Sequence, residues 1–113
     1  IIILDKVFFA SNKSKIKSKS YSLLKDVATV LKDNEWVKKV RIEGHTDDTG
    51  KHESNMKLSQ ARAEAVKTYL IKQGVAAERL EAVGYGPDKP LVNDTTKDAR
   101  AQNRRVEFSI VSD

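Results

Sequence analysis

Hydrophobic residues along this chain recur with two periods, and the change from one to the other predicts its secondary structure. Four segments are rich in β-branched and aromatic residues or alternate between apolar and polar positions, which is typical of strands. They are residues 1–9, 37–43, 79–85 and 104–111. Two longer segments, residues 20–32 and 54–73, carry apolar residues at the three- and four-residue spacing of an amphipathic helix.

Turn-forming residues separate these segments. Asn34 and Gly74 are expected to end the two helices. Residues 86–95 form a long loop, and Thr95 or Thr96 is expected to cap a short helical turn before the last strand. The order strand–helix–strand–helix–strand–loop–strand predicts an α+β fold with the helices packed on one face of a small mixed sheet.

Composition and charge narrow the function classes. The chain has 113 residues, and we expect residues 1–113 to form a single domain with one modest core. The net charge of +5 favours acidic partners, but the lysines are scattered, and the densest stretch, residues 13–19, alternates with serine, which argues against a nucleic-acid partner. The absence of cysteine excludes disulfides and thiolate metal sites.

Two features concern the cellular context. No apolar run reaches the roughly 18 residues that indicate a membrane span. The chain opens directly on a strand-like segment, so we expect a domain cut from a longer protein, with any targeting segment or membrane anchor upstream.

Arg62 conflicts with the apolar pattern of the second helix. On a helical wheel that starts at Leu58 and advances about 100° per residue, Arg62 falls at roughly 40° and Asn55 at roughly 60°. The apolar stripe spans roughly −20° to 120° and contains Ala65, Val66, Tyr69 and Leu70. An unpaired buried guanidinium costs several kcal/mol, so Arg62 needs an anionic partner or must reach into a pocket.

Two explanations of Arg62 remain open. The preceding loop supplies Asp47 and Asp48, either of which could form an internal salt bridge with it. Alternatively, the loop is a ligand site, because it leaves the carboxyl end of a strand and enters a helix, where free N–H groups favour a carboxylate. Asp47 and Arg62 would then suit a ligand with an amine and a carboxylate on one carbon.

His45, Arg104 and Arg105 are weaker candidates. His45 fits a residue that bonds the backbone and holds a loop, because its spacing from His52 matches no metal-ligand pattern. Neighbouring strand residues point to opposite faces, so at most one of Arg104 and Arg105 can face the same pocket. We expect neither an enzyme nor a cofactor or metal, since no nucleophile, ligand set or catalytic carboxylate pair is recognisable.

Several motifs together resemble the family of OmpA-like C-terminal domains. In chain order they are VFF at residues 7–9 with Asn12, IEGHTD at 42–47, TG at 49–50, Asn55, LS at 58–59, RA at 62–63, GV at 74–75, RL at 79–80, GYG at 84–86 with Pro90, and NRRVE at 103–107. The resemblance covers essentially the whole chain. The family includes outer-membrane porin tails, peptidoglycan-associated lipoproteins and the periplasmic part of flagellar stator proteins.

The resemblance implies a βαβαββ two-layer sandwich that binds peptidoglycan non-covalently through the zwitterionic end of meso-diaminopimelate in the stem peptide. Asp47 would pair with the amine of the ligand and Arg62 with its carboxylate. The further ligand-binding residues implied are Thr49 and Asn55 as hydrogen-bonding neighbours, Asn12 in the pocket lining and Arg104 at the rim. The domain would anchor the outer membrane or a periplasmic complex to the wall, at the periplasmic face of the outer membrane of a Gram-negative bacterium.

One departure and one alternative accompany this interpretation. Many family members carry Asp after the phenylalanine of the first strand, where this chain has Ala10 and then Ser11. The alternative is a structural interaction domain in which Asp47 and Arg62 form only an internal bridge and the partner is a periplasmic protein. Contact with a membrane is expected only through a segment outside this chain.

Overall fold

The computed structural model describes residues 7–9 and 13–112. Its strands are β1 (Val7–Phe8), β2 (Lys39–Gly44), β3 (Leu80–Gly84) and β4 (Arg105–Ser112). Its helices are α1 (Tyr21–Asp33), α2 (His52–Lys72) and α3 (Lys97–Asn103), with short 3₁₀ turns η1 (Ser18–Ser20) and η2 (Ala77–Arg79). These bounds fall within about two residues of the predicted ones, except that the predicted strand at residues 1–9 lies mostly outside the described residues.

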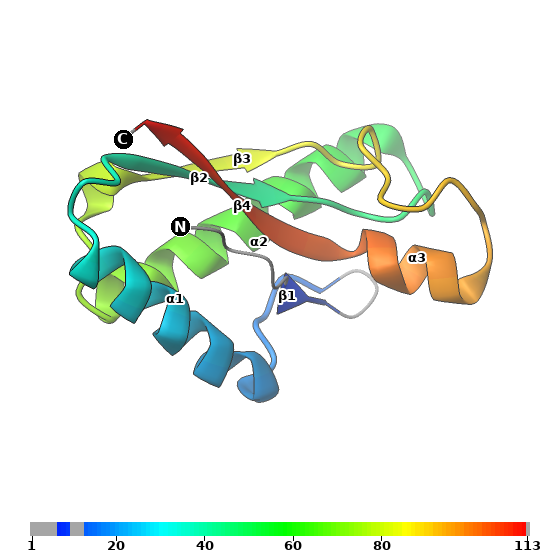
Figure 1. Ribbon diagram of the computed structural model, residues 1–113. Coiled ribbons are helices and arrows are strands. Elements are labelled where there is room, and N and C mark those ends of the chain that lie inside the picture. The colour runs from blue at the N-terminus through cyan, green and yellow to red at the C-terminus, as the bar shows by residue number, and fades with distance from the viewer. Residues whose placement is uncertain (1–6, 10–12, 113) are drawn as a thin grey trace.

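The four strands form one mixed sheet in the order β1-β4-β2-β3, which confirms the predicted fold class. β2 and β3 are parallel and are joined by α2, so they form the expected crossover unit (Figure 1). β4 runs antiparallel to both β2 and β1 and lies between them. Consecutive strands β1 and β2 are therefore separated by the last strand of the chain.

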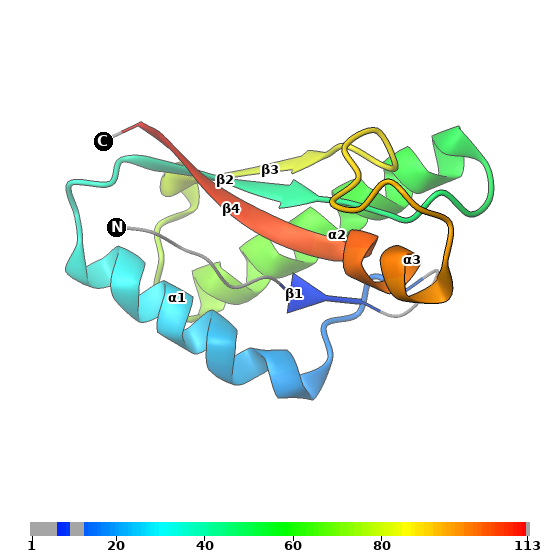
Figure 2. The same cartoon turned by 45° about the vertical axis from the view of Figure 1, so that its right-hand side comes forward.

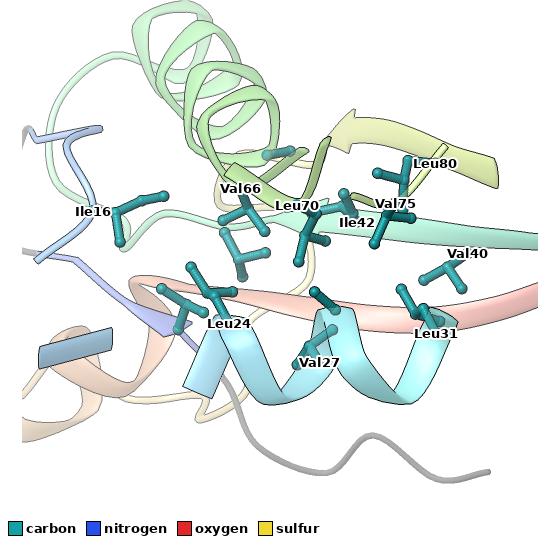
Figure 3. Packing of buried hydrophobic residues seen from close by; sticks show 14 of the residues in the cluster. Ile16, Leu24, Val27, Leu31, Val40, Ile42, Val66, Leu70, Val75 and Leu80 are labelled. Atoms are coloured by element: carbon teal, nitrogen blue, oxygen red, sulfur yellow. The ribbon is translucent and has the colours of Figure 1, made fainter. Parts of the chain in front are cut away.

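Helices α1 and α2 pack on the same side of the sheet, as Figures 1 and 2 show. Their buried side chains meet the inward-facing side chains of the strands, among them Val40 and Ile42 of β2 (Figure 3). Burying each such aliphatic side chain contributes about 1.5–3 kcal/mol. Thr96 caps the N-terminus of α3, as expected, because its Oγ1 accepts the N–H of Ala99 at 3.2 Å. Among the described residues, no helix has the length and apolarity needed to span a bilayer.

Two glycines allow α2 to lie directly against the carboxyl ends of β2 and β3. Gly44 and Gly84 are Cα partners across the two strands. A Cβ on Gly44 would overlap the backbone carbonyl of Ser59, and a Cβ on Gly84 would overlap the backbone nitrogen of Gln60. This close approach places the next turn of α2, with Arg62, beside the loop that leaves β2.

Candidate functional site

The loop between β2 and α2 is held in place by its own polar side chains. The N–H of His45 donates to Arg105 O at 2.9 Å, which prolongs the pairing of β2 with β4 by one residue. Asp47 Oδ1 accepts the N–H of Thr49 at 2.9 Å, and Asn55 Nδ2 donates to Thr49 O at 2.9 Å. Thr49 and Asn55, both expected at the site, therefore fix the backbone around Asp47.

Asp47 is buried and bonds to Arg104. Arg104 Nη1 donates to Asp47 Oδ2 at 2.8 Å, and Arg104 Nε donates to Phe9 O at 3.2 Å. Burial alone would raise the pKa of the Asp47 carboxyl, but hydrogen bonds from Arg104 and Thr49 outweigh it and hold that pKa below its usual value. Asp47 is thus an anion at neutral pH, and a cation already bonds to it.

Arg62 is fully buried, at 0% exposure, which confirms the position inferred from the helical wheel. Its Nε donates to Lys13 O at 2.7 Å and its Nη1 to His45 O at 3.0 Å. The ring of Phe9 lies 5.1 Å from its Cζ. Burial lowers the pKa of Arg62 to about 10, with Asp47 acting in the opposite direction, so the guanidinium remains charged at neutral pH.

Both acids of the loop interact with arginines. Asp47 interacts electrostatically with both Arg62 and Arg104, so two guanidinium groups share one carboxylate. The second loop acid, Asp48, bonds to Arg100 of α3 at 2.9 Å. Each of the two acids considered as an internal partner for Arg62 therefore bonds to another arginine, Asp47 to Arg104 and Asp48 to Arg100.

Other predicted residues lie elsewhere. Asn12 lies outside the described residues. Arg105, the first residue of β4, bonds to other partners than Arg104 does, because it donates to Lys89 O at 3.0 Å and Asn103 O at 3.1 Å. The structure assigns Arg105 to holding the neighbouring loop, while Arg104 contacts Asp47.

A polar cluster on the other face of the sheet was not found from the sequence. Possible metal-binding atoms of Glu43, His45 and Glu107 lie within 4.8 Å of one another. Arg105 Nε lies 3.4 Å from Glu107 Oε1, so a guanidinium already supplies positive charge there. Burial, helped by Arg105, lowers the pKa of His45 to about 4, and its ring stacks on Tyr85. His45 is thus a neutral, packed residue at the base of the loop.

A cavity of about 260 Å³ adjoins the same loop. Thr46 and Asp48 line one part of it, and Pro87, Pro90, residues 92–95 and Asn103 line another.

The comparisons with known proteins agree with this architecture. The model of the OmpA family matches residues 8–104. The probable lipoprotein YiaD of Escherichia coli is 43% identical over 106 residues, which cover 94% of this chain and 48% of that protein. This chain therefore spans about half the length of that relative.

Solved structures show the same fold. The crystal structure of the peptidoglycan-associated lipoprotein from Burkholderia pseudomallei superposes with a TM-score of 0.87 at 34% identity, covering 91% of this chain and 86% of the other. The C-terminal domain of Helicobacter pylori MotB gives a TM-score of 0.90 at 25% identity, covering 97% and 86%. None of these three relatives is named as an enzyme. The chain belongs to the OmpA family.

Proposed function

We propose that this domain binds peptidoglycan non-covalently through the zwitterionic end of meso-diaminopimelate, and so anchors an outer membrane or a periplasmic complex to the cell wall. The observation that carries the proposal is that the buried Asp47 carboxylate bonds to the half-buried Arg104 and also interacts electrostatically with the buried guanidinium of Arg62. A relative of the same fold is named a peptidoglycan-associated lipoprotein, which supports the choice of polymer. We further propose that residues 1–113 form one such domain and act on the periplasmic side of a Gram-negative outer membrane.

The binding step is an exchange of ion pairs. The ammonium group of the ligand replaces the Arg104 guanidinium on Asp47 Oδ2, where Arg104 Nη1 now lies at 2.8 Å. The ligand carboxylate then accepts hydrogen bonds from Arg62, and Arg104 moves to the rim of the site. Thr49 and Asn55 keep the Asp47 carboxylate oriented through the loop hydrogen bonds described above.

Asn12, outside the described residues, is proposed to line the pocket. We expect the site to hold the polymer without cleaving it, because the sequence contains no recognisable nucleophile, metal-ligand set or catalytic carboxylate pair. Incubation with purified walls should therefore release no soluble muropeptides over time.

The same geometry predicts which walls are bound. Diaminopimelate in an uncross-linked stem keeps a free amine and a free carboxylate on one carbon, whereas lysine at the same place keeps only the amine. With a lysine stem, Arg62 gains no anion. Losing one charge-assisted, bidentate contact costs about 1.5–3 kcal/mol, or about 10–100-fold in Kd.

Isothermal titration calorimetry with two matched tripeptides tests the proposal. One is L-Ala-γ-D-Glu-diaminopimelate and the other carries L-Lys in the third position. We expect measurable binding of the first and at least about 10-fold weaker binding of the second. Equal affinity for both peptides, or no heat with the diaminopimelate peptide, would contradict the proposed mode of capture.

A further inference from the structure

The segment before α1 forms a cationic cavity that the proposed diaminopimelate site does not use. Lys13, Lys15 and Lys17 all line a cavity of about 500 Å³, together with Ile16, Ser18 and Tyr21. All three lysines are exposed. No ion pair is found for any of them within residues 7–9 and 13–112. Three lysines therefore line one cavity, and none of them forms an ion pair with a described carboxylate.

The start of the helical segment adds to the positive potential of this cavity. Lys17 is the N-cap of η1 and makes no side-chain capping bond, and α1, which follows, carries no acid in its first turn. The positive end of the α1 dipole favours an anion near this segment. Tyr21 forms part of the wall and is fixed by stacking on Tyr69, with ring centroids 4.9 Å apart.

The cavity is joined to the proposed ligand site through the backbone. Arg62 Nε donates to Lys13 O at 2.7 Å, so the first lysine of the cavity is held directly against the buried arginine. A ligand whose carboxylate bonds to Arg62 would therefore present its neighbouring groups to Lys13 and the lysines that follow.

We propose that Lys13, Lys15 and Lys17 form a second anionic subsite, which takes the free α-carboxylate of the D-glutamate that precedes diaminopimelate in the stem peptide. This inference rests on the proposed function, because it assigns a partner for the next residue of the same ligand. The carboxylate lies near three ammonium groups at the open surface, so the attraction is moderate and sensitive to salt. A single exposed ion pair changes affinity by about 1.5–5-fold, and we expect about 3–10-fold from the shared contact.

The subsite discriminates between a carboxylate and its amide. The probes are L-Ala-γ-D-Glu-diaminopimelate and the same peptide in which the α-carboxylate of the glutamate is amidated. Calorimetry at low salt should give about 3–10-fold tighter binding of the acid, and the preference should shrink as salt is added.

Two triple variants with the same loss of charge separate the subsite from a general charge effect. The subsite variant combines Lys13→Ala, Lys15→Ala and Lys17→Ala. The control replaces three lysines that are exposed and do not line this cavity, and it combines Lys25→Ala, Lys57→Ala and Lys72→Ala. The subsite variant should bind the amidated peptide as the wild type does and should show no preference for the acid, whereas the control should keep that preference.

The outcomes distinguish the lysine subsite from the proposed capture of diaminopimelate, on which it rests. If the wild type binds both peptides equally, or if the control loses the preference to the same extent, the lysine subsite is wrong while capture of diaminopimelate stands. If neither peptide binds, the proposed function fails, and the subsite fails with it.

Discussion

Replacing Arg62 by alanine separates the contribution of this residue to stability from its contribution to ligand binding. The substitution removes hydrogen bonds to Lys13 O and His45 O, both of which would be left without that donor inside the fold. A hydrogen bond from a charged group contributes about 1.5–3 kcal/mol, and truncating a group in a buried charged network costs about 3–5 kcal/mol. We therefore expect Arg62→Ala to lower the free energy of unfolding by about 3–5 kcal/mol.

That loss should be visible without abolishing the fold. A domain of this size has a total stability of about 5–15 kcal/mol, and each kcal/mol corresponds to roughly 4 °C, so the unfolding midpoint should fall by about 12–20 °C. The matched variant Arg62→Lys keeps the charge but not the planar fork of donors. It should lose only about 1–2 kcal/mol of stability, yet bind the diaminopimelate tripeptide at least about 10-fold more weakly.

Both quantities are measured on the same samples, thermal unfolding by circular dichroism and affinity by calorimetry well below the midpoint of each variant. If Arg62→Ala unfolds at the temperature of the wild type, the contribution assigned to its buried hydrogen bonds is wrong. If it is destabilised but binds normally, the arginine is a structural residue only. If Arg62→Lys binds as the wild type does, bidentate recognition of a carboxylate is refuted.

Four further variants test neighbouring parts of the structure. Asp47→Asn removes the anion with little change of shape, and calorimetry should show about 10–100-fold weaker binding of the same tripeptide; undiminished binding would exclude Asp47 as the amine anchor. Gly44→Ala should lower the free energy of unfolding, measured with urea, by about 1–3 kcal/mol or more, because the new Cβ meets backbone atoms of α2. Gly50→Ala is the matched control: the residue has a φ of 87° but open space around it, so its loss should be only about 1–2 kcal/mol. As pH falls from 6.5 to about 4, the unfolded chain binds a proton at His45 that the folded chain does not, so stability should decrease by up to about 3 kcal/mol. His45→Gln should flatten the pH dependence of stability in that window, and an unchanged slope would exclude His45 as its source.

The sequence carried enough information to place the buried arginine but not its surroundings. The burial of Arg62 follows from helical periodicity, which is local, and the polar loop at the end of β2 follows from composition. The bond between Arg104 and Asp47 depends on β4 lying beside β2 with Gly44 opposite Val106. That register is set by packing over the whole sheet, and no local pattern specifies it.

The same limit explains the polar cluster on the opposite face. Glu43 and His45 lie two residues apart, so their shared face could be read from strand alternation. Glu107 joins them only because it is the Cα partner of Glu43 in β4. The position of β4 between β1 and β2 could likewise not be predicted from the sequence, because the order of strands and helices along a chain does not determine which strands are neighbours.

Arg104 has a consequence for how the domain folds. Its two hydrogen bonds, to Phe9 O and to Asp47, join residues 95 and 57 positions apart in the chain. Contacts of such long range carry a large loop-closure entropy and form late, after local helices and the β2–α2–β3 unit can already exist. The arrangement of charges around Asp47 is therefore complete only when the first and last strands have both joined the sheet. A folding intermediate that lacks either of them, or a chain cut near either end, would retain much of its helical structure but not this arrangement of charges.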